Sequence, residues 1–146
     1  MDAIPLSRQR FTLRRASAMS VEYFRQQIHS TEAFIAEANE KLRRLRECRS
    51  KLLSQEGTMA DDRAQFKEPE LSNETWNGKH ADQFEQTRES EVVSTYQELI
   101  DTTGDAIERT DRQISMTVDV ISHQNSLLSN YKIGLENAIE REREKK

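Results

Sequence analysis

The feature that most constrains this fold is a pair of long stretches in which apolar residues return every three or four positions. In the first stretch the steps alternate between three and four, the seven-residue repeat of a helix that lies along another helix. Its positions are Val21, Phe24, Ile28, Thr31, Ile35, Ala38, Leu42 and Leu45. A strict seven-residue row of aliphatic residues marks the second stretch: Ile100, Ile107, Ile114, Ile121, Leu128 and Leu135. The pattern predicts an all-α chain.

One break separates the two stretches. Gly57, Pro69 and the polar run 72–74 are turn signals, and the apolar periodicity fails between them. We therefore predict helices over 20–55 and 78–140, joined by a connection over 56–77.

The two helices are expected to pair antiparallel over the length of the first. Ser20 is a plausible N-cap of the first helix, and Gly57 is its natural stop. Gly104 is the one credible point at which the second helix, otherwise extended, would kink or break.

The composition fits long, half-exposed helices better than a sheet. Hydrophobic residues make up 34% and charged residues 33% of the 146, with Gly 4 and Pro 2. So thin an apolar complement cannot build a thick core. The net charge of -4 argues against nucleic acid as a partner. No apolar run approaches the roughly 20 residues of a membrane span, so membrane insertion is not expected.

The first 18 residues form a separate segment. They contain Arg8, Arg10, Arg14 and Arg15 against one acid, Asp2. We interpret residues 1–18 as a disordered basic tail ahead of a helical hairpin domain over 19–146. The same composition is typical of a mitochondrial transit peptide. The alternative function is therefore a coiled-coil structural or scaffold protein with an Arg-rich targeting segment.

Residues suited to chemistry are scattered. His29, His80 and His123 have no second His or Cys at ligand spacing, and Cys48 is interpreted as a small filler near the seam between the helices. We assign no catalytic, cofactor-binding or metal-binding residues and predict a protein that is not an enzyme. A basic cluster over 41–51 is interpreted as the solvated face of a helix end, where positive charge favours the helix dipole.

The bend between the helices carries a compact motif. Trp76 supplies a large side chain where two helices diverge. Gly78 permits a conformation or an approach that a Cβ would obstruct. Ala81 and Phe84, three positions apart, should share one face of the starting helix. The motif predicts a hairpin end closed by an indole.

Trp76, Gly78, Ala81 and Phe84 together resemble the W-x-G-x-x-A-x-x-F signature of the WXG superfamily of small helical-hairpin proteins. The long first helix and the extended second helix resemble its YwqH-like branch in Gram-positive bacteria, over roughly residues 19–146. The resemblance implies an adaptor that binds the helical N-terminal segment of a cognate LXG-type toxin and assists its type VII (Esx) secretion. It implies a cytoplasmic protein, with export alongside its partner as the open alternative.

The chain departs from the family in its export signal, and its region after Trp76 is longer than in the minimal hairpins. Family substrates often carry Tyr-x-x-x-Asp/Glu after the second helix, whereas Tyr96 is followed four residues on by Ile100, and Tyr131 by Leu135. The chain would then depend on its partner for an export signal. That partner is expected to be an LXG toxin or another small helical protein, with homo-oligomers also open.

The aliphatic row Ile100 to Leu135 is our predicted partner-binding face. It is longer than a first helix over 20–55 can cover, and Thr and Gln occupy its companion positions. Exposed apolar stripes of this size mark interaction sites.

Overall fold

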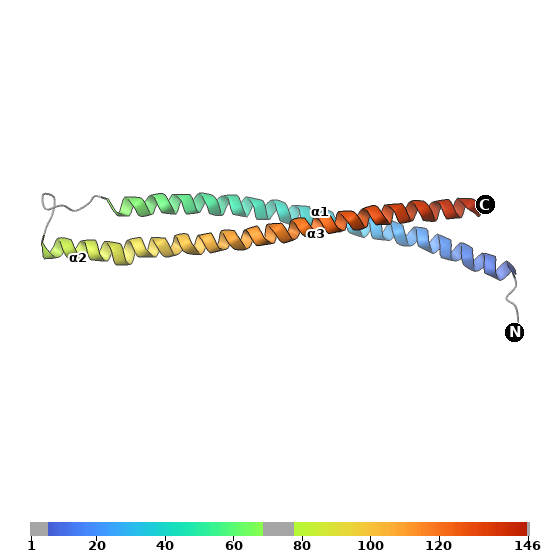
Figure 1. Cartoon of the computed structure of the whole chain (residues 1–146), viewed down its shortest axis with the longest axis horizontal. Helices are drawn as coiled ribbons and strands as arrows, with labels where there is room; N and C mark the ends of the chain where they lie inside the picture. The colour runs from blue at the N-terminus through green and yellow to red at the C-terminus, as the bar shows by residue number, and fades with distance from the viewer. Residues whose placement is uncertain (1–5, 69–77, 146) are drawn as a thin grey trace, which may run out of the picture. The chain divides into compact units, whose positions relative to one another are not determined.

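The computed structural model describes residues 6–68 and 78–145, with side chains described from residue 20 onward. Four helical elements follow one another (Figure 1): α1 (Leu6–Phe66), α2 (Lys79–Thr87), the π-helix η1 (Arg88–Val93) and α3 (Ser94–Glu144). The described residues contain no strand, which confirms the all-α prediction.

The chain divides into two compact units, and parts of α1 and α3 belong to each. Unit 1 consists of Met1–Leu42 and Met116–Lys146, and unit 2 consists of Arg43–Ser115.

Within unit 2 the two helices run antiparallel. The Phe66 and Tyr96 rings lie with centroids 4.9 Å apart, and Arg49 earlier on α1 pairs with Asp111 later on α3. Residues earlier on α1 therefore pair with residues later on α3, so the two helices run in opposite directions.

Unit 1 has the same arrangement. Lys132 Nζ lies 4.0 Å from Glu32 Oε1, and the Phe24 ring, earlier on α1, packs on the backbone at Gly134, later on α3. The predicted antiparallel helical hairpin is thus confirmed inside each unit.

The first helix is longer than predicted. We expected it to end near Gln55 at Gly57, but α1 continues to Phe66 and Gly57 lies in its interior. A helical glycine costs only about 1 kcal/mol relative to Ala. Packing beyond it, at half-buried Met59 and in the contact between the Phe66 and Tyr96 rings, outweighs that cost.

The seven-residue repeat also runs past Leu45, but its members turn polar. The same alternation of three and four continues through half-buried positions Arg49, Leu52, Glu56, Met59 and Arg63 to Phe66. Since charged residues occupy every second position, the apolar pattern that marked the first part of the helix disappears from the sequence.

The helix also starts earlier than predicted. α1 begins at Leu6, so residues 6–18 are helical where we expected a disordered tail. Residues 6–18 contain neither Gly nor Pro, and Arg, Leu and Ala are good helix formers. Residues 1–5 lie outside the described part.

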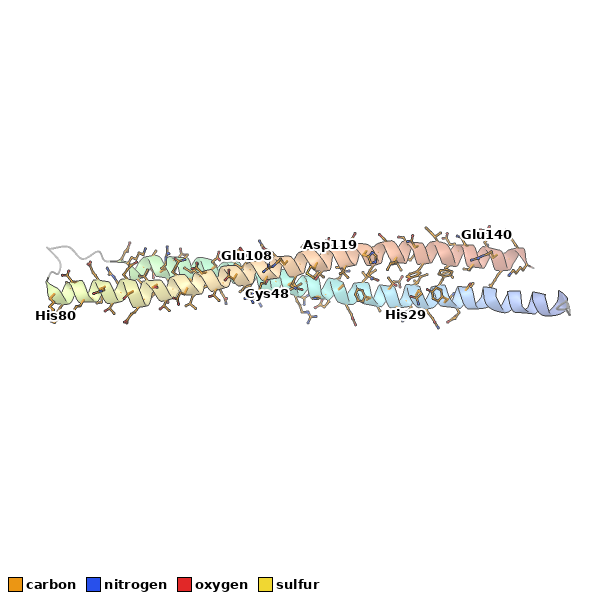
Figure 2. All side chains as sticks on the ribbon, turned by 60° about the horizontal axis from the view of Figure 1, so that its bottom comes forward. His29, Cys48, His80, Glu108, Asp119 and Glu140 are labelled. Carbon is orange, nitrogen blue, oxygen red and sulfur yellow. The ribbon has the colours of Figure 1, made fainter. Side chains whose placement is uncertain are left out.

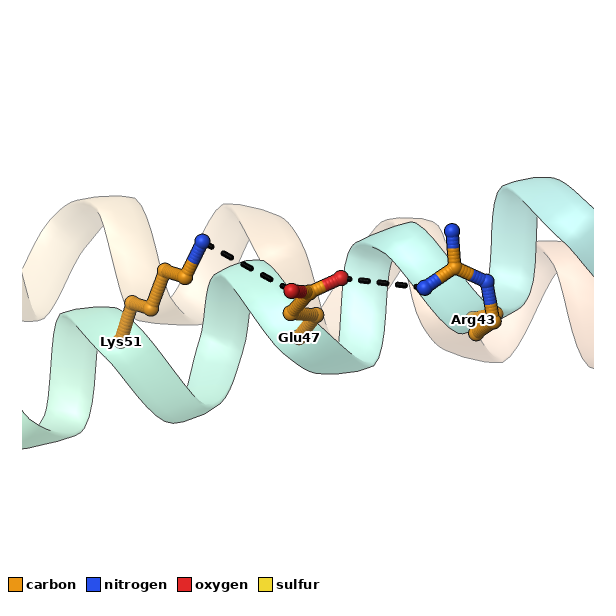
Figure 3. A network of polar contacts seen from close by, with 3 residues as sticks. All are labelled: Arg43, Glu47 and Lys51. Carbon is orange, nitrogen blue, oxygen red and sulfur yellow. Dashed lines mark hydrogen bonds and ion pairs between the residues drawn. The ribbon is translucent and has the colours of Figure 1, made fainter.

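The basic cluster over 41–51 lies in the middle of α1, so the helix dipole does not explain it. Figure 3 shows two of its cations beside one carboxylate. Glu47 sits between two cations, with Arg43 Nη1 at 3.1 Å from one carboxylate oxygen and Lys51 Nζ at 3.7 Å from the other. All three side chains are largely exposed. Such pairs four residues apart are worth a few tenths of a kcal/mol. The basic residues of the cluster lie on a solvated face, as predicted, except Arg49, which is half-buried.

The second helical region spans nearly the predicted range, but its irregularity lies elsewhere. Gly104 is inside α3 and does not break it. The departure from α geometry is η1, which ends at Val93, well before Gly104.

Candidate functional site

Gly78 starts the second helical region in a conformation that demands glycine. Its φ is 101° and its ψ is -174°, a region essentially closed to residues with a Cβ. Its carbonyl oxygen accepts the backbone N–H of Asp82 at 3.1 Å, the first turn of α2. A Cβ at Gly78 would meet no atom of the described residues within 4 Å. With respect to those residues, glycine is required for backbone freedom and not for close approach. Trp76 lies outside the described residues.

The next two motif residues differ in solvent exposure. Ala81 is 3% exposed, whereas Phe84 is 47% exposed. The Arg88 guanidinium carbon lies 5.4 Å from the centroid of the Phe84 ring, a cation–π contact. The two are neighbours about 60° apart round the helix, but they differ in burial: Ala81 lies in the seam, and Phe84 presents its ring to solvent.

η1 corrects the register between this motif and the rest of the helix. One series of buried and half-buried positions runs Ala81, Glu85, Arg88, Val92, Tyr96, Ile100, Thr103 and Ile107, and it is flanked by buried Val93 and by half-buried Gln97, Gly104 and Ala106. A regular repeat would alternate steps of three and four, but three consecutive steps of four follow Arg88. The N–H of Ser94 bonds to the carbonyl of Glu89, five residues back, so the π turn accommodates one extra residue. Ala81 and Ile107 thus face the same way.

The predicted partner-binding row is placed in the seam. Ile107 is 8% exposed, and Ile100, Ile114, Ile121, Leu128 and Leu135 are half-buried. The premise that the first helix is too short to cover this row was wrong, because α1 has 61 residues. In this structure the row packs inside the hairpin units and is not a free surface.

The companion row is compatible with that packing. Thr103 Oγ1 donates to the carbonyl of Leu99 at 2.8 Å, and Thr110 Oγ1 donates to that of Ala106 at the same distance. A threonine that bonds to its own helix one turn back can sit in a seam with its hydroxyl satisfied. Thr103 and Thr110 therefore do not require a partner chain to satisfy their hydroxyls.

Unit 2 has an unusual seam. Arg49, Glu56 and Arg63 occupy consecutive positions of one seven-residue row, where unit 1 has aliphatic residues. Arg49 pairs with Asp111, and Arg63 donates to the side-chain oxygen of Gln97. The Nε of Arg63 is buried without an acceptor among the described residues. An unpaired buried donor is costly, so this seam is held less firmly than an apolar one.

The candidate reactive residues remain separate. His29 lies on α1 in unit 1, while Cys48 and His80 lie on different helices of unit 2, and all three are exposed (Figure 2). Cys48 does not fill the seam as we had expected. In the described residues no group of three His, Cys, Asp or Glu side chains is placed to hold a metal ion.

A model of the YwqH-like family matches residues 20–138. The chain belongs to the YwqH-like family. The match includes the motif, η1 and parts of both units. Searches of curated proteins and of solved structures found no match. Among the described residues, no helix is both long enough and apolar enough to span a membrane.

Two features of this YwqH-like chain were not predicted from the sequence. The polar seam of unit 2 was not predicted because charged residues interrupt its apolar repeat. The register shift at η1 does leave a signal, the three consecutive steps of four between Arg88 and Ile100. Those positions were not read as a series because Glu85 and Arg88 are charged.

Proposed function

We propose that this YwqH-like protein is a non-enzymatic adaptor of the WXG superfamily that binds the helical N-terminal segment of a cognate LXG-type toxin. In this role it assists the export of the toxin by type VII (Esx) secretion. The observation that carries the proposal is the family match over residues 20–138, together with the motif Trp76, Gly78, Ala81 and Phe84 within it.

The exposed motif residue suggests where a toxin helix could begin to dock. Phe84 is held against Arg88 and remains 47% exposed, so its ring can bury further apolar area on binding. Aromatic and Arg side chains are the residue types that most often anchor protein interfaces. Docking at Phe84 replaces the aliphatic row as the proposed contact.

The test is co-expression of the full chain with a tagged LXG segment encoded beside it. We expect the two to co-purify as a complex of fixed stoichiometry. Phe84→Asp should weaken the complex about tenfold or more, because a charge would be buried at an apolar anchor. Leu53→Asp is the matched control, since Leu53 is another exposed apolar residue of unit 2.

Two results would contradict the proposal. One is the absence of any complex with the neighbouring LXG segment. The other is unchanged secretion of the toxin from cells that lack this gene. A complex that Phe84→Asp leaves intact would reject the Phe84 anchor while keeping the adaptor role.

A further inference from the structure

The seam of unit 2 has two flanks, one on each side of the line along which its helices pack. The seam series on α2, η1 and α3 alternates between two rows, and one row consists of Glu85, Val92, Ile100 and Ile107. The residue directly before each member of this row lies about 100° round the helix, always on the same flank. These preceding residues are Phe84, Glu91, Leu99 and Ala106. We call this side of unit 2 the Phe84 flank.

The opposite flank is bridged by polar side chains that reach across from α1. Arg49 pairs with Asp111, and Arg63 donates to the side-chain oxygen of Gln97. Asp111 and Gln97 each directly follow a member of the other seam row, so both contacts lie on this flank. We call it the bridged flank.

The Phe84 flank instead presents large apolar side chains to solvent. Phe84 and Leu99 are each 47% exposed, and Val92 between them is half-buried. Positions 84 and 99 lie about 22 Å apart along a helix, which is roughly four turns. An occupant that covers both side chains must therefore be elongated, as a helix is.

Unit 2 is also polarised in charge along its length. Residues 56–68 and 78–105, which we call the acidic end, carry eleven acidic and four basic side chains. The rest of the unit, residues 43–55 and 106–115, carries three acidic and seven basic ones. Two cations of the acidic end are engaged within the chain, because Arg88 lies over the Phe84 ring and Arg63 donates to Gln97. The apolar pair Phe84 and Leu99 therefore lies in strongly acidic surroundings, with exposed Glu91 between them on the same flank.

We propose that the Phe84 flank binds a basic amphipathic helix of at least about four turns. Its apolar stripe covers Phe84 and Leu99, and its Lys and Arg side chains lie against the acidic end. This inference rests on the proposed function and specifies the toxin segment, whose docking helix carries a net positive charge. The same acidity disfavours nucleic acid and anionic lipid as occupants of this flank.

The two features of the site make separate contributions to binding. Burial of the exposed apolar side chains supplies affinity, because a few such anchors dominate the energy of an interface. Charge complementarity selects a basic helix over an acidic one and speeds its encounter with the flank. Each contribution can be tested with a matched pair of substitutions.

Leu99 and Leu53 test the apolar contribution. Both are exposed leucines of unit 2, at 47% and 41%. Leu53 directly follows the half-buried Leu52, which places it on the bridged flank. We would titrate the full chain with the purified LXG segment encoded beside it and measure Kd by calorimetry. Leu99→Gln should raise Kd about tenfold, whereas Leu53→Gln should change it less than about twofold.

Glu91 and Glu89 test the charge contribution. Both are exposed glutamates of η1, and Glu89 directly follows Arg88, which places it on the bridged flank. Glu91→Lys should raise Kd about tenfold because a cation would face the basic helix, whereas Glu89→Lys should raise it about threefold or less. Raising NaCl from about 0.1 M to about 1 M should weaken the wild-type complex about tenfold or more, since salt screens exposed charges.

Circular dichroism would check that each variant keeps its helix content, as expected for four exposed positions. If Leu99→Gln loses helicity, Leu99→Ala and Leu53→Ala take the place of that pair. Equal effects within either pair overturn the inference, and so does a wild-type Kd that does not rise with salt. In those cases a complex still forms, so the adaptor function stands. The absence of any complex would reject the adaptor function and this inference together.

Discussion

The glycines of this chain show how one residue type serves opposite purposes. Gly78 adopts a positive φ that only glycine tolerates, whereas Gly57 is an exposed interior residue of α1, where a Cβ would meet none of the described atoms within 4 Å. We predict that Gly78→Ala destabilises the protein by about 1–3 kcal/mol through backbone strain. Gly57→Ala should stabilise it by roughly 0.5–1 kcal/mol through helix propensity. Thermal unfolding of both variants measures the two effects, and a shared sign would refute the assignment.

Gly134 represents a third case, in which the limit is space. A Cβ there would lie 2.5 Å from the Phe24 ring, well inside van der Waals contact. Propensity alone would favour Gly134→Ala by about 1 kcal/mol, but overpacking typically costs 1–3 kcal/mol. We therefore predict a net loss of stability, measured by urea unfolding. Adding Phe24→Leu should make the same alanine less harmful, and strict additivity of the two substitutions would disprove the steric account.

At the scale of an element, η1 accommodates one extra residue in the seven-residue repeat, so that the seam positions on both sides of it face α1. Its one extra residue separates two segments whose repeats are each intact, Ala81–Arg88 and Tyr96 onward. Removing Ser94, the exposed residue that directly follows η1, would restore the alternation of three and four and convert the π turn to α. We predict that this deletion changes stability by no more than about 0.5 kcal/mol.

Deleting Ser122 is the matched control for η1, because it is an exposed serine in the regular part of α3. Its loss would rotate the seam by about 100° on one side of the deletion and expose aliphatic residues. We expect a fall of several kcal/mol, seen as a lower thermal midpoint by circular dichroism. Equal effects of the two deletions would show that η1 has no role in register.

For the whole molecule, the sequence was sufficient wherever aliphatic residues occupy the repeat. The apolar repeats predicted two helices, their pairing and the all-α class; they lie in residues 21–45 and in the row from Ile100 to Leu135. The end of α1 was misplaced because Arg49, Glu56 and Arg63 occupy core positions, and periodicity methods read charge as exposure. That error made the first helix appear too short and turned a buried row into a predicted binding face. Solvent exposure of Phe84 and Leu99 depends on rotation about the helix axis, which only the packed structure fixes.

The contrast between the two seams leads to a prediction about local stability. Unit 1 aligns Val21, Ile28, Ile35 and Leu42 where unit 2 has Arg49, Glu56 and Arg63. Apolar burial raises the free energy of local opening more than polar seam positions do, so backbone amides in 49–63 should exchange with deuterium faster than those in 28–42.

Arg63→Met removes the buried donor that lacks an acceptor among the described residues and keeps the side-chain volume similar. Such replacements in buried polar sites are often stabilising, by about 1 kcal/mol or more. Exchange over 49–63 should therefore slow in Arg63→Met, while that over 28–42 stays unchanged. Slower exchange in 49–63 than in 28–42 of the wild type would mean that the polar seam is the stronger one.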